Sequence, residues 1–174
     1  MPGNDTWAEM FLVDAEETAA MPARRTLSFS RTPTVLLTFA ANRFTRQSAA
    51  ALQAKFSIGA MDWRMLVMLT RHPGATVALS AETIGIDKAA ISRSLQRLEE
   101  KGLAAPMPHD NDPRRKDWTL TKEGEVLHDE ILTVVLDRLE QQLAGFSDEE
   151  IKEFTRLLGK FHRNLENTSR SENA

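Results

Sequence analysis

The sequence predicts a mainly α-helical protein with one small β wing: a winged helix-turn-helix domain flanked by N- and C-terminal helices. Three features support this fold class. A helix, a tight turn and a second helix are expected within 76–102, a basic-tipped hairpin within 103–121, and long amphipathic helices on both sides. At 174 residues the chain can hold one such domain together with dimerisation helices.

The helix-turn-helix is the most specific of these features. In the turn IGID, Gly85 allows the sharp bend and Asp87 is a good N-cap for the next helix. In that helix Ile91, Leu95 and Leu98 share one face at spacings of four and three. The opposite face is polar or basic and carries Lys88, Ser92, Arg93, Gln96 and Arg97.

A charged hairpin follows this helix. Two short apolar arms, LAAPMPH and DWTLT, enclose the tip DNDPRRK, which is too polar to be core. The tip carries three consecutive cations, Arg114, Arg115 and Lys116, and we expect Asp112 to orient Arg114 through an ion pair. Two basic elements at this spacing converge on one surface, an arrangement typical of DNA binding.

These residues resemble the MarR-type winged-helix transcriptional regulators. The wing is similar to the family's D-x-R-x5-L-T signature at Asp112, Arg114, Leu120 and Thr121, and IGIDKAAISRSLQRLEEKGL resembles its helix-turn-helix. The resemblance covers about residues 32–165. It implies an obligate homodimer that represses or activates promoters, with Arg114 entering a minor groove.

The chain departs from that family pattern at two places. Ala89 and Ala90 stand where many members have Ser or Thr, which leaves direct base readout to fewer side chains. Ser80 stands where a large aliphatic residue is common, so we expect a shifted or loosely packed support helix.

The flanking segments predict further helices. Thr6 and Glu9 fit a capping box for a short amphipathic helix over 6–20, on which Trp7, Met10 and Phe11 share a face. A basic linker is expected from Met21 to Arg31, and Thr32 and Pro33 then start a long helix that ends near Phe56. The remaining expected elements are a helix over 60–71, a one-bridge strand over 76–77, a support helix over 79–84, a helix over 122–144 and, after a capping box of Ser147 and Glu150, a last helix to about Glu166.

These elements divide the chain into five predicted parts. They are an N-terminal extension (1–31), a dimerisation helix (32–57), a winged helix-turn-helix DNA-binding domain (58–121), C-terminal dimerisation helices (122–166) and a disordered tail (167–174). Acidic residues gather at both ends: residues 1–22 hold five acids and no Lys or Arg. The net charge of −3 is therefore compatible with a basic DNA-facing surface, because the local field governs association.

The last predicted helix carries a regular apolar seam. Its apolar residues are spaced three, four, three and four apart, like the a and d positions of a coiled coil. From the pattern alone, packing within the chain is nearly as well supported as packing between chains, and the family resemblance favours the dimer interface. The seam consists of Ile151, Phe154, Leu158, Phe161 and Leu165.

A ligand pocket is a further hypothesis. Relatives bind small aromatic acids where the dimer arm meets the winged domain, so the resemblance implies a small aromatic or anionic effector. Trp63 and its neighbouring methionines are core residues in one interpretation and pocket wall in another. In the second interpretation Arg43, Arg46 or Arg64 would hold a carboxylate, and our candidate pocket residues are Arg43, Trp63 and Arg64.

Other classes find little support. The chain has no cysteine, which excludes disulfides and thiol redox sensing. The four histidines fall in separate segments (72, 109, 128 and 162), so no metal site is expected. No nucleophile-base motif or phosphate loop occurs, and we expect neither an enzyme nor a cofactor. No apolar run reaches the ~18 residues of a membrane span, and a cytoplasmic protein is expected.

The sequence therefore favours a homodimeric, sequence-specific DNA-binding transcriptional regulator, most simply a repressor, on a pseudo-palindromic double-stranded DNA operator. Gln96 and Arg97 are candidates for base edges, and Lys88, Ser92 and Lys116 are candidates for phosphates. Two alternatives remain open at this stage. One is a winged-helix protein-interaction module, and the other is a non-specific DNA-compacting protein without an effector.

Overall fold

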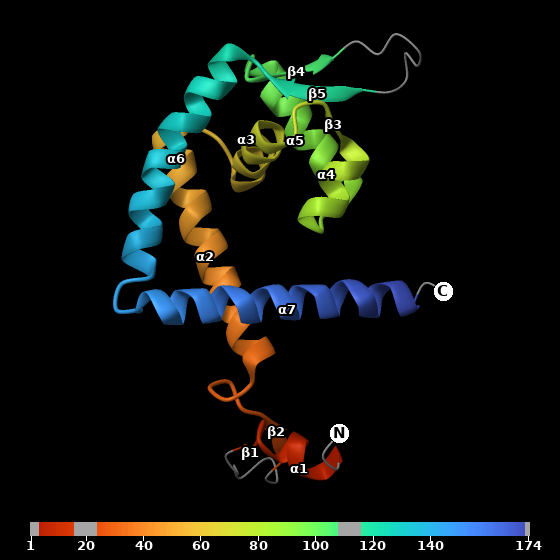
Figure 1. The fold of residues 1–174 in the computed structure, drawn as a ribbon, viewed down its shortest axis with the longest axis vertical. Helices are drawn as coiled ribbons and strands as arrows, with labels where there is room; N and C mark the ends of the chain where they lie inside the picture. Colours follow the sequence, from red (N-terminus) through yellow and green to blue (C-terminus); the bar gives the residue numbers. More distant parts are fainter. Residues whose placement is uncertain (1–3, 16–23, 108–115, 173–174) are drawn as a thin grey trace.

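The computed structural model describes residues 4–15, 24–107 and 116–172. It has a winged domain at one end, a small N-terminal hairpin at the other, and long helices between them (Figure 1). The described helices are α1 (Asn4–Glu9), α2 (Pro33–Phe56), α3 (Ala60–Arg71), α4 (Val77–Ile84), α5 (Lys88–Glu100), α6 (Lys122–Gln142) and α7 (Asp148–Glu172). The described strands are β1 (Leu12–Asp14), β2 (Arg25–Leu27), β3 (Ala75–Thr76), β4 (Ala104–Met107) and β5 (Asp117–Leu120).

The winged domain consists of α3, α4, α5 and a three-stranded antiparallel sheet in the order β3-β5-β4. In this sheet Ala75 pairs with Trp118, and Pro106 pairs with Trp118 from the other side. The largest buried side chains gather between α3 and α5, where the seam predicted for α5 packs on the apolar face of α3. This core includes Met65, Leu66, Leu69, Ile91, Leu95 and Leu98.

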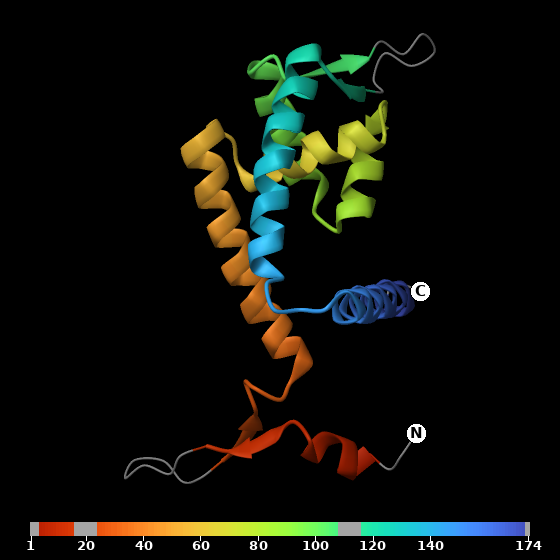
Figure 2. The same cartoon turned by 60° about the vertical axis from the view of Figure 1, so that its left-hand side comes forward.

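The long helices form a framework outside this domain. Helix α2 runs from the N-terminal hairpin up to the winged domain, α6 returns beside it, and α7 leaves the end of α6 and crosses the line of α2 (Figures 1 and 2). Buried residues of α2 and α6 lie only near the winged domain, at Leu52, Gly124, His128 and Ile131. No helix among the described residues is long and apolar enough to cross a membrane.

The winged domain and α6 are joined by an unusually close approach. Thr121 caps α6 by accepting a hydrogen bond from the Gly124 N–H (3.1 Å), and its own hydroxyl donates to the Gly102 carbonyl (2.6 Å). A Cβ at Gly124 would lie 1.9 Å from the Leu103 carbonyl oxygen. Only glycine fits there, so α6 starts from a rigid junction.

The helix predicted over 6–20 is confirmed only over 6–9, and its last part, 16–20, lies outside the described residues. Helix α1 ends at Glu9, Thr6 lies inside it and cannot be its N-cap, and the chain then forms β1. The predicted basic linker is wrong, because β2 pairs with β1 in an antiparallel hairpin that sets Leu12 opposite Leu27. Trp7 and Phe11, which we predicted to share a helical face, do lie side by side: their rings pack edge-to-face with centroids 5.0 Å apart.

Smaller differences concern element ends. The disordered tail predicted for 167–174 is wrong over its described part, because α7 continues to Glu172. The capping box at its start is confirmed: the Ser147 N–H donates to Glu150 (2.8 Å), and the Glu150 N–H donates to the Ser147 hydroxyl (3.2 Å). The strand predicted over 76–77 lies one residue earlier, and α4 starts at Val77 because Thr76 is its N-cap.

Candidate nucleic-acid interface and adjoining cavity

Helix α5 has the local structure that its sequence predicts. Gly85 adopts a left-handed backbone (φ 72°), and the Asp87 carboxylate accepts a hydrogen bond from the Ala90 N–H at 2.8 Å. The helix ends before Gly102, which has φ 69°. Its predicted core face is fully buried, so the opposite face is turned to solvent in a fixed orientation.

That solvent-facing surface carries most of the predicted DNA-contacting residues. Lys88, Arg93 and Gln96 are exposed, and Ser92 is half-buried beside them. Lys116 is exposed just before β5, with its Nζ 5.9 Å from the ring centroid of Trp118. Three other predicted wing residues, Asp112, Arg114 and Arg115, lie outside the described residues.

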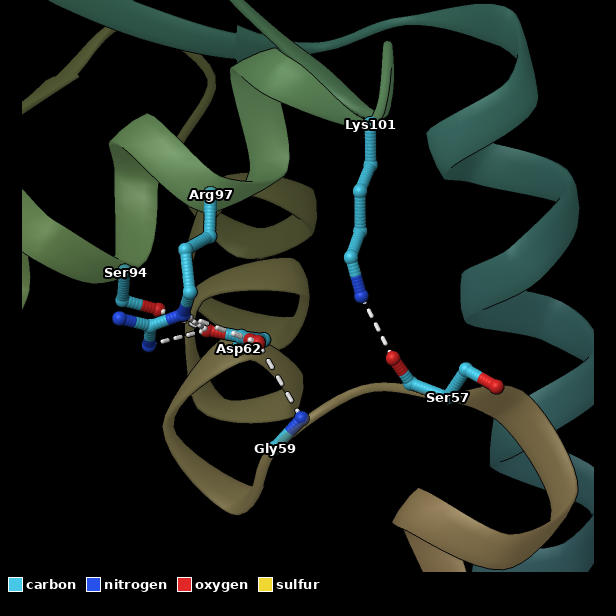
Figure 3. A network of polar contacts seen from close by, with 6 residues as sticks. All are labelled: Ser57, Gly59, Asp62, Ser94, Arg97 and Lys101. Atoms are coloured by element: carbon cyan, nitrogen blue, oxygen red, sulfur yellow. Dashed lines mark hydrogen bonds and ion pairs between the residues drawn. The ribbon is translucent and has the colours of Figure 1, made fainter.

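Arg97 has an intramolecular partner that its sequence position did not reveal. Its guanidinium donates from Nη2 (2.6 Å) and Nε (3.2 Å) to Oδ1 of Asp62 on α3 (Figure 3). The same carboxylate accepts hydrogen bonds from the Ser94 hydroxyl (2.7 Å) and the Gly59 N–H (3.1 Å). Arg97 is half-exposed while Asp62 is buried, so the ion pair ties the surface of α5 to the start of α3.

The electrostatics of Asp62 favour its charged form. Burial alone would raise the pKa of this carboxyl, but the hydrogen bonds from Arg97, Ser94 and Gly59 together outweigh that effect and lower it. The carboxylate is therefore ionised at neutral pH, and Arg97 remains bound to it. Arg97, which we predicted to contact base edges, thus uses its Nε and Nη2 atoms for hydrogen bonds within the protein.

A second cation joins α5 to the end of α2. Lys101, the C-cap of α5, donates from Nζ to the carbonyl oxygen of Ser57 at 2.5 Å (Figure 3). Ser57 is the C-cap of α2 and has a left-handed backbone (φ 57°). The segment between α2 and α3 is thus held by Lys101 at Ser57 and, at Gly59, by Asp62, the carboxylate that Arg97 also binds.

A cavity of about 240 Å³ lies where α2, α3 and α6 meet. Two of the three predicted pocket residues, Trp63 and Arg64, line it. Arg43 does not line it, although the next residue along α2, Phe44, does. Arg138 on α6 lines it instead, and sequence spacing could not place that residue beside Arg64. The other walls are apolar or weakly polar and include Phe44, Leu52, Phe56, Val134, Val135 and Leu139.

Trp63 also connects this cavity to α6. Its ring stacks on the buried His128 ring, with centroids 5.4 Å apart and planes inclined by 25°. The Nδ1 atom of His128 lies 2.9 Å from a carboxylate oxygen of Asp129. Among the described residues, no group of three or more His, Cys, Asp or Glu could hold a metal ion.

The predicted seam on α7 is only partly covered within the chain. Phe154, Leu158 and Phe161, together with Leu157, form one wall of a groove of about 390 Å³ whose other wall is the first half of α2. Phe154 is still 46% exposed and Leu157 48% exposed. Of the other two predicted seam residues, Ile151 is half-buried and Leu165 is exposed, and neither lines the groove.

Comparison with known proteins agrees with this architecture. A family model described as MarR family matches residues 56–115. A MarR/EmrR family transcriptional regulator from Acinetobacter sp. ADP1 is 28% identical, with 81% of this chain and 99% of that chain covered and a TM-score of 0.75. Over residues 56–115 the chain is therefore similar to the MarR family, and its fold is similar to that of this transcriptional regulator.

Two more distant structures share the fold. One is a MarR family regulator from Listeria monocytogenes complexed with 26mer DNA, at 20% identity, 79% and 91% coverage and a TM-score of 0.73. The other is the PcaV transcriptional regulator from Streptomyces coelicolor in complex with its natural ligand, at 21% identity, 79% and 96% coverage and a TM-score of 0.67.

Proposed function

We propose that this protein binds double-stranded DNA as a homodimer and regulates transcription, with α5 as the recognition helix in the major groove. The observation that carries the proposal is the two-sided character of α5. One face is locked into the core, and the other presents Lys88, Arg93 and Gln96 to solvent beside the wing. The relative crystallised with a 26mer DNA has the same fold and supports this choice.

The side chains of this surface suit different tasks. Gln96 is exposed in the third turn of α5, and its amide can both donate to and accept from an adenine edge. Lys88 at the helix start and Lys116 at the base of the wing suit phosphates, which fix register without reading sequence. Arg97, held by Asp62, is better suited to orient α5 than to read a base freely.

The dimer is the second part of the proposal. Helices α2, α6 and α7 expose large apolar residues that include Leu36, Phe39, Leu136 and Phe154. Apolar surface of this extent is rarely left in water. A symmetric second copy would cover it and set two α5 helices about 34–36 Å apart, which suits a pseudo-palindromic operator.

The cavity between α2, α3 and α6 is the proposed effector site. Its apolar walls suit an aromatic ring, and Arg64 and Arg138 supply positive charge for a carboxylate. It lies between the framework and the α3 helix that holds α5 through Asp62. A ligand there can therefore change the separation of the two recognition helices and release a repressor from its operator.

The test of DNA binding is titration of random-sequence duplexes at several salt concentrations. The proposal predicts affinity that falls steeply with salt, as counterions are released from phosphates. Lys116→Ala should flatten the plot of log K against log salt by roughly one unit for each phosphate that the variant no longer neutralises. Lys152→Ala, on α7, is the matched control. Binding that is absent or insensitive to salt would instead favour a protein-interaction module.

The effector site has its own test. Aromatic carboxylates, starting with benzoate, are screened by thermal shift, because a ligand at 100 times its dissociation constant adds ~2.7 kcal/mol of stability. Arg64→Ala and Arg138→Ala should remove the response to a compound that stabilises the parent. Arg43→Ala, whose side chain lies outside the cavity, should keep it. A hit that all three variants retain would place the ligand elsewhere.

A further inference from the structure

The connection between α2 and α3, called here the α2–α3 joint, consists of residues 57–59 and has a fixed conformation. Ser57 has a left-handed backbone (φ 57°), and it is the one described residue other than glycine with a positive φ. A residue with a Cβ adopts this conformation at a cost, so the surrounding contacts have to hold it. Ile58 follows with 1% exposure and packs in the hydrophobic core. The joint is therefore a defined corner of the structure.

The α2–α3 joint is also a corner of the cavity that we propose as the effector site. Leu52 and Phe56 line the cavity from the last turns of α2. Ala60 and Trp63 line it from the first turn of α3, and a further wall comes from α6. A molecule in the cavity therefore contacts the helices on both sides of the joint. Any change that it makes in the angle between α2 and α3 has to occur at residues 57–59.

Two polar contacts hold the α2–α3 joint against the winged domain. Lys101, the C-cap of α5, donates from Nζ to the Ser57 carbonyl at 2.5 Å (Figure 3). The Gly59 N–H donates to the Asp62 carboxylate at 3.1 Å, and Arg97 of α5 donates to the same group. Both ends of the joint are thus connected, directly or through Asp62, to the helix that we propose for DNA recognition.

Lys101 differs from Arg97 in what it connects. Asp62 and Arg97 both belong to the winged domain, so their ion pair can move with that domain as a unit. The Lys101 contact instead joins the end of α5 to the backbone at the end of α2, 44 residues earlier. Ser57 caps a helix of 24 residues, whose terminal carbonyls carry partial negative charge that favours a cation. Lys101 therefore links the winged domain to the framework across the joint.

We propose that Lys101 is a positioning residue that couples the effector cavity to the recognition helix. The inference rests on the proposed effector site and adds to it the contact through which a ligand acts on α5. When the angle between α2 and α3 changes, the Ser57 carbonyl moves relative to α5, and either the bond to Lys101 breaks or the end of α5 follows. In both cases the energy of each α5 position depends on the state of the cavity, which is the condition for coupling between two sites.

Filling the cavity by mutation tests this coupling without a known ligand. Ala51 lines the cavity, so Ala51→Phe attaches an aromatic ring to its wall. The ring has room, since an apolar cavity of about 150 Å³ already admits benzene. The dissociation constant for DNA is measured at fixed salt with a duplex that the parent protein selects from a random library, and the ring should raise it at least about fivefold. Ser48→Phe, which enters the cavity from the preceding turn of α2, is the second filled variant if Ala51→Phe does not fold.

The same ring is then introduced into Lys101→Met, which keeps the length of the side chain and removes its charge and its donor. The quantity compared is the ratio of the DNA dissociation constants with and without the ring, whatever the affinity of Lys101→Met itself. This ratio should fall to within about twofold of unity, and Lys101→Arg, which can still donate to Ser57, should restore most of it. Lys55→Met is the matched control, because it removes a cation beside the joint and leaves the bond to Ser57 in place. It should keep the ratio of the parent.

Each failure of this experiment has a separate meaning. An equal ratio in Lys101→Met and in the parent would overturn the role of Lys101 while the proposed effector site stands. Loss of the ratio in Lys55→Met, or no recovery in Lys101→Arg, would also overturn it, because charge or packing near the joint would then explain the effect. A ring that leaves the DNA affinity of the parent unchanged in the folded filled variants would overturn the regulatory cavity as well. A parent protein that binds no DNA would overturn the proposed function as a whole.

Discussion

The winged domain and the framework treat their apolar residues in opposite ways. In the winged domain the seam of α5 is fully buried against α3, so the domain completes its core within one chain. In the framework, α7 carries an equally regular seam, yet its Phe154, like Phe39 on α2, remains about half-exposed. An amphipathic pattern shows that a helix will bury a face, but it does not show against which chain.

This difference has a functional meaning. Because the winged domain completes its own core, the exposed surface of α5 is held in one orientation by contacts within the domain. In the proposed dimer, the framework would set the distance between two such surfaces. The cavity between α2, α3 and α6, which we propose as the effector site, lies at the boundary of the two regions.

The largest effect is expected from a charge placed in the framework seam. Phe154→Asp should dissociate or unfold the dimer, because an unpaired carboxylate in an apolar interface costs several kcal/mol. Thr155→Asp, the adjacent exposed position, is the control of equal charge and should leave the dimer intact. Sedimentation and circular dichroism make the comparison. An intact, folded dimer in Phe154→Asp would mean that the interface lies elsewhere.

The same substitution should have effects of opposite sign on stability at two glycines, one at the junction of α6 with the winged domain and one in the middle of α7. Gly124→Ala should destabilise the protein by several kcal/mol, because its Cβ would meet the Leu103 carbonyl oxygen at 1.9 Å. Gly159→Ala in α7 meets only the end of Arg163 at 3.5 Å and should stabilise by up to about 1 kcal/mol. Urea denaturation measures both. Equal effects would contradict the rigid junction at the start of α6.

An intermediate effect is expected at the carboxylate that joins α3 to α5. Asp62→Ala leaves Arg97 and Ser94 without their acceptor and should cost about 2–3 kcal/mol, since Arg97 is half-exposed and partly compensated by water. The exposed Asp137→Ala is the control. The two variants are compared by urea denaturation at neutral pH, where equal losses would remove any special role for Asp62.

The pH dependence of Asp62 follows from its lowered pKa. A carboxyl whose folded-state pKa lies below its unfolded value stabilises the fold above the unfolded value, and this stability is lost as pH falls through the folded value. The stability gap between the parent and Asp62→Ala should therefore be constant near neutral pH and shrink below about pH 4. A gap that widens in acid would reverse the sign and contradict the assignment.

The smallest effect concerns Ser80 on α4. Its hydroxyl is fully buried and has no hydrogen-bond partner among the described residues. Ser80→Ala should therefore be neutral or stabilise by about 1 kcal/mol, because the cost of burying an unsatisfied hydroxyl disappears. Thermal unfolding detects such a change. A destabilisation of more than about 1 kcal/mol would show that the hydroxyl has an ordered partner.

The structural features that depend on neighbouring residues were predicted correctly from the sequence. The cap at Asp87, the turn at Gly85 and the seam of α5 each depend on residues within a few positions, and the structure confirms them. Features that depend on residues far apart in the sequence were not predicted. The side chains of Trp7 and Phe11 fit a helix period, but strand pairing of Leu12 with Leu27 decides the local structure of the extension.

The candidate site shows the same division. The exposed face of α5 was predicted correctly because it is the complement of a local apolar seam. The ion pair of Arg97 with Asp62 was missed because 35 residues separate them, and no pattern in either helix marks the other. The same holds for the residues that line the cavity. Trp63 and Arg64 are neighbours on α3 and were both candidates from the sequence, whereas Arg138 lies on α6, more than 70 residues away, and was not.

The most direct test of the account is selection of duplexes from a random library by the full-length protein at fixed salt. A homodimer reading DNA with two α5 helices predicts a two-fold symmetric motif with half-sites about 10–10.5 base pairs apart, centre to centre. Gln96→Ala should lose preference at one symmetric pair of positions, at ~1–3 kcal/mol per contact. Selection of an asymmetric motif, or no enrichment at all, would contradict the symmetric reader that the framework is proposed to build.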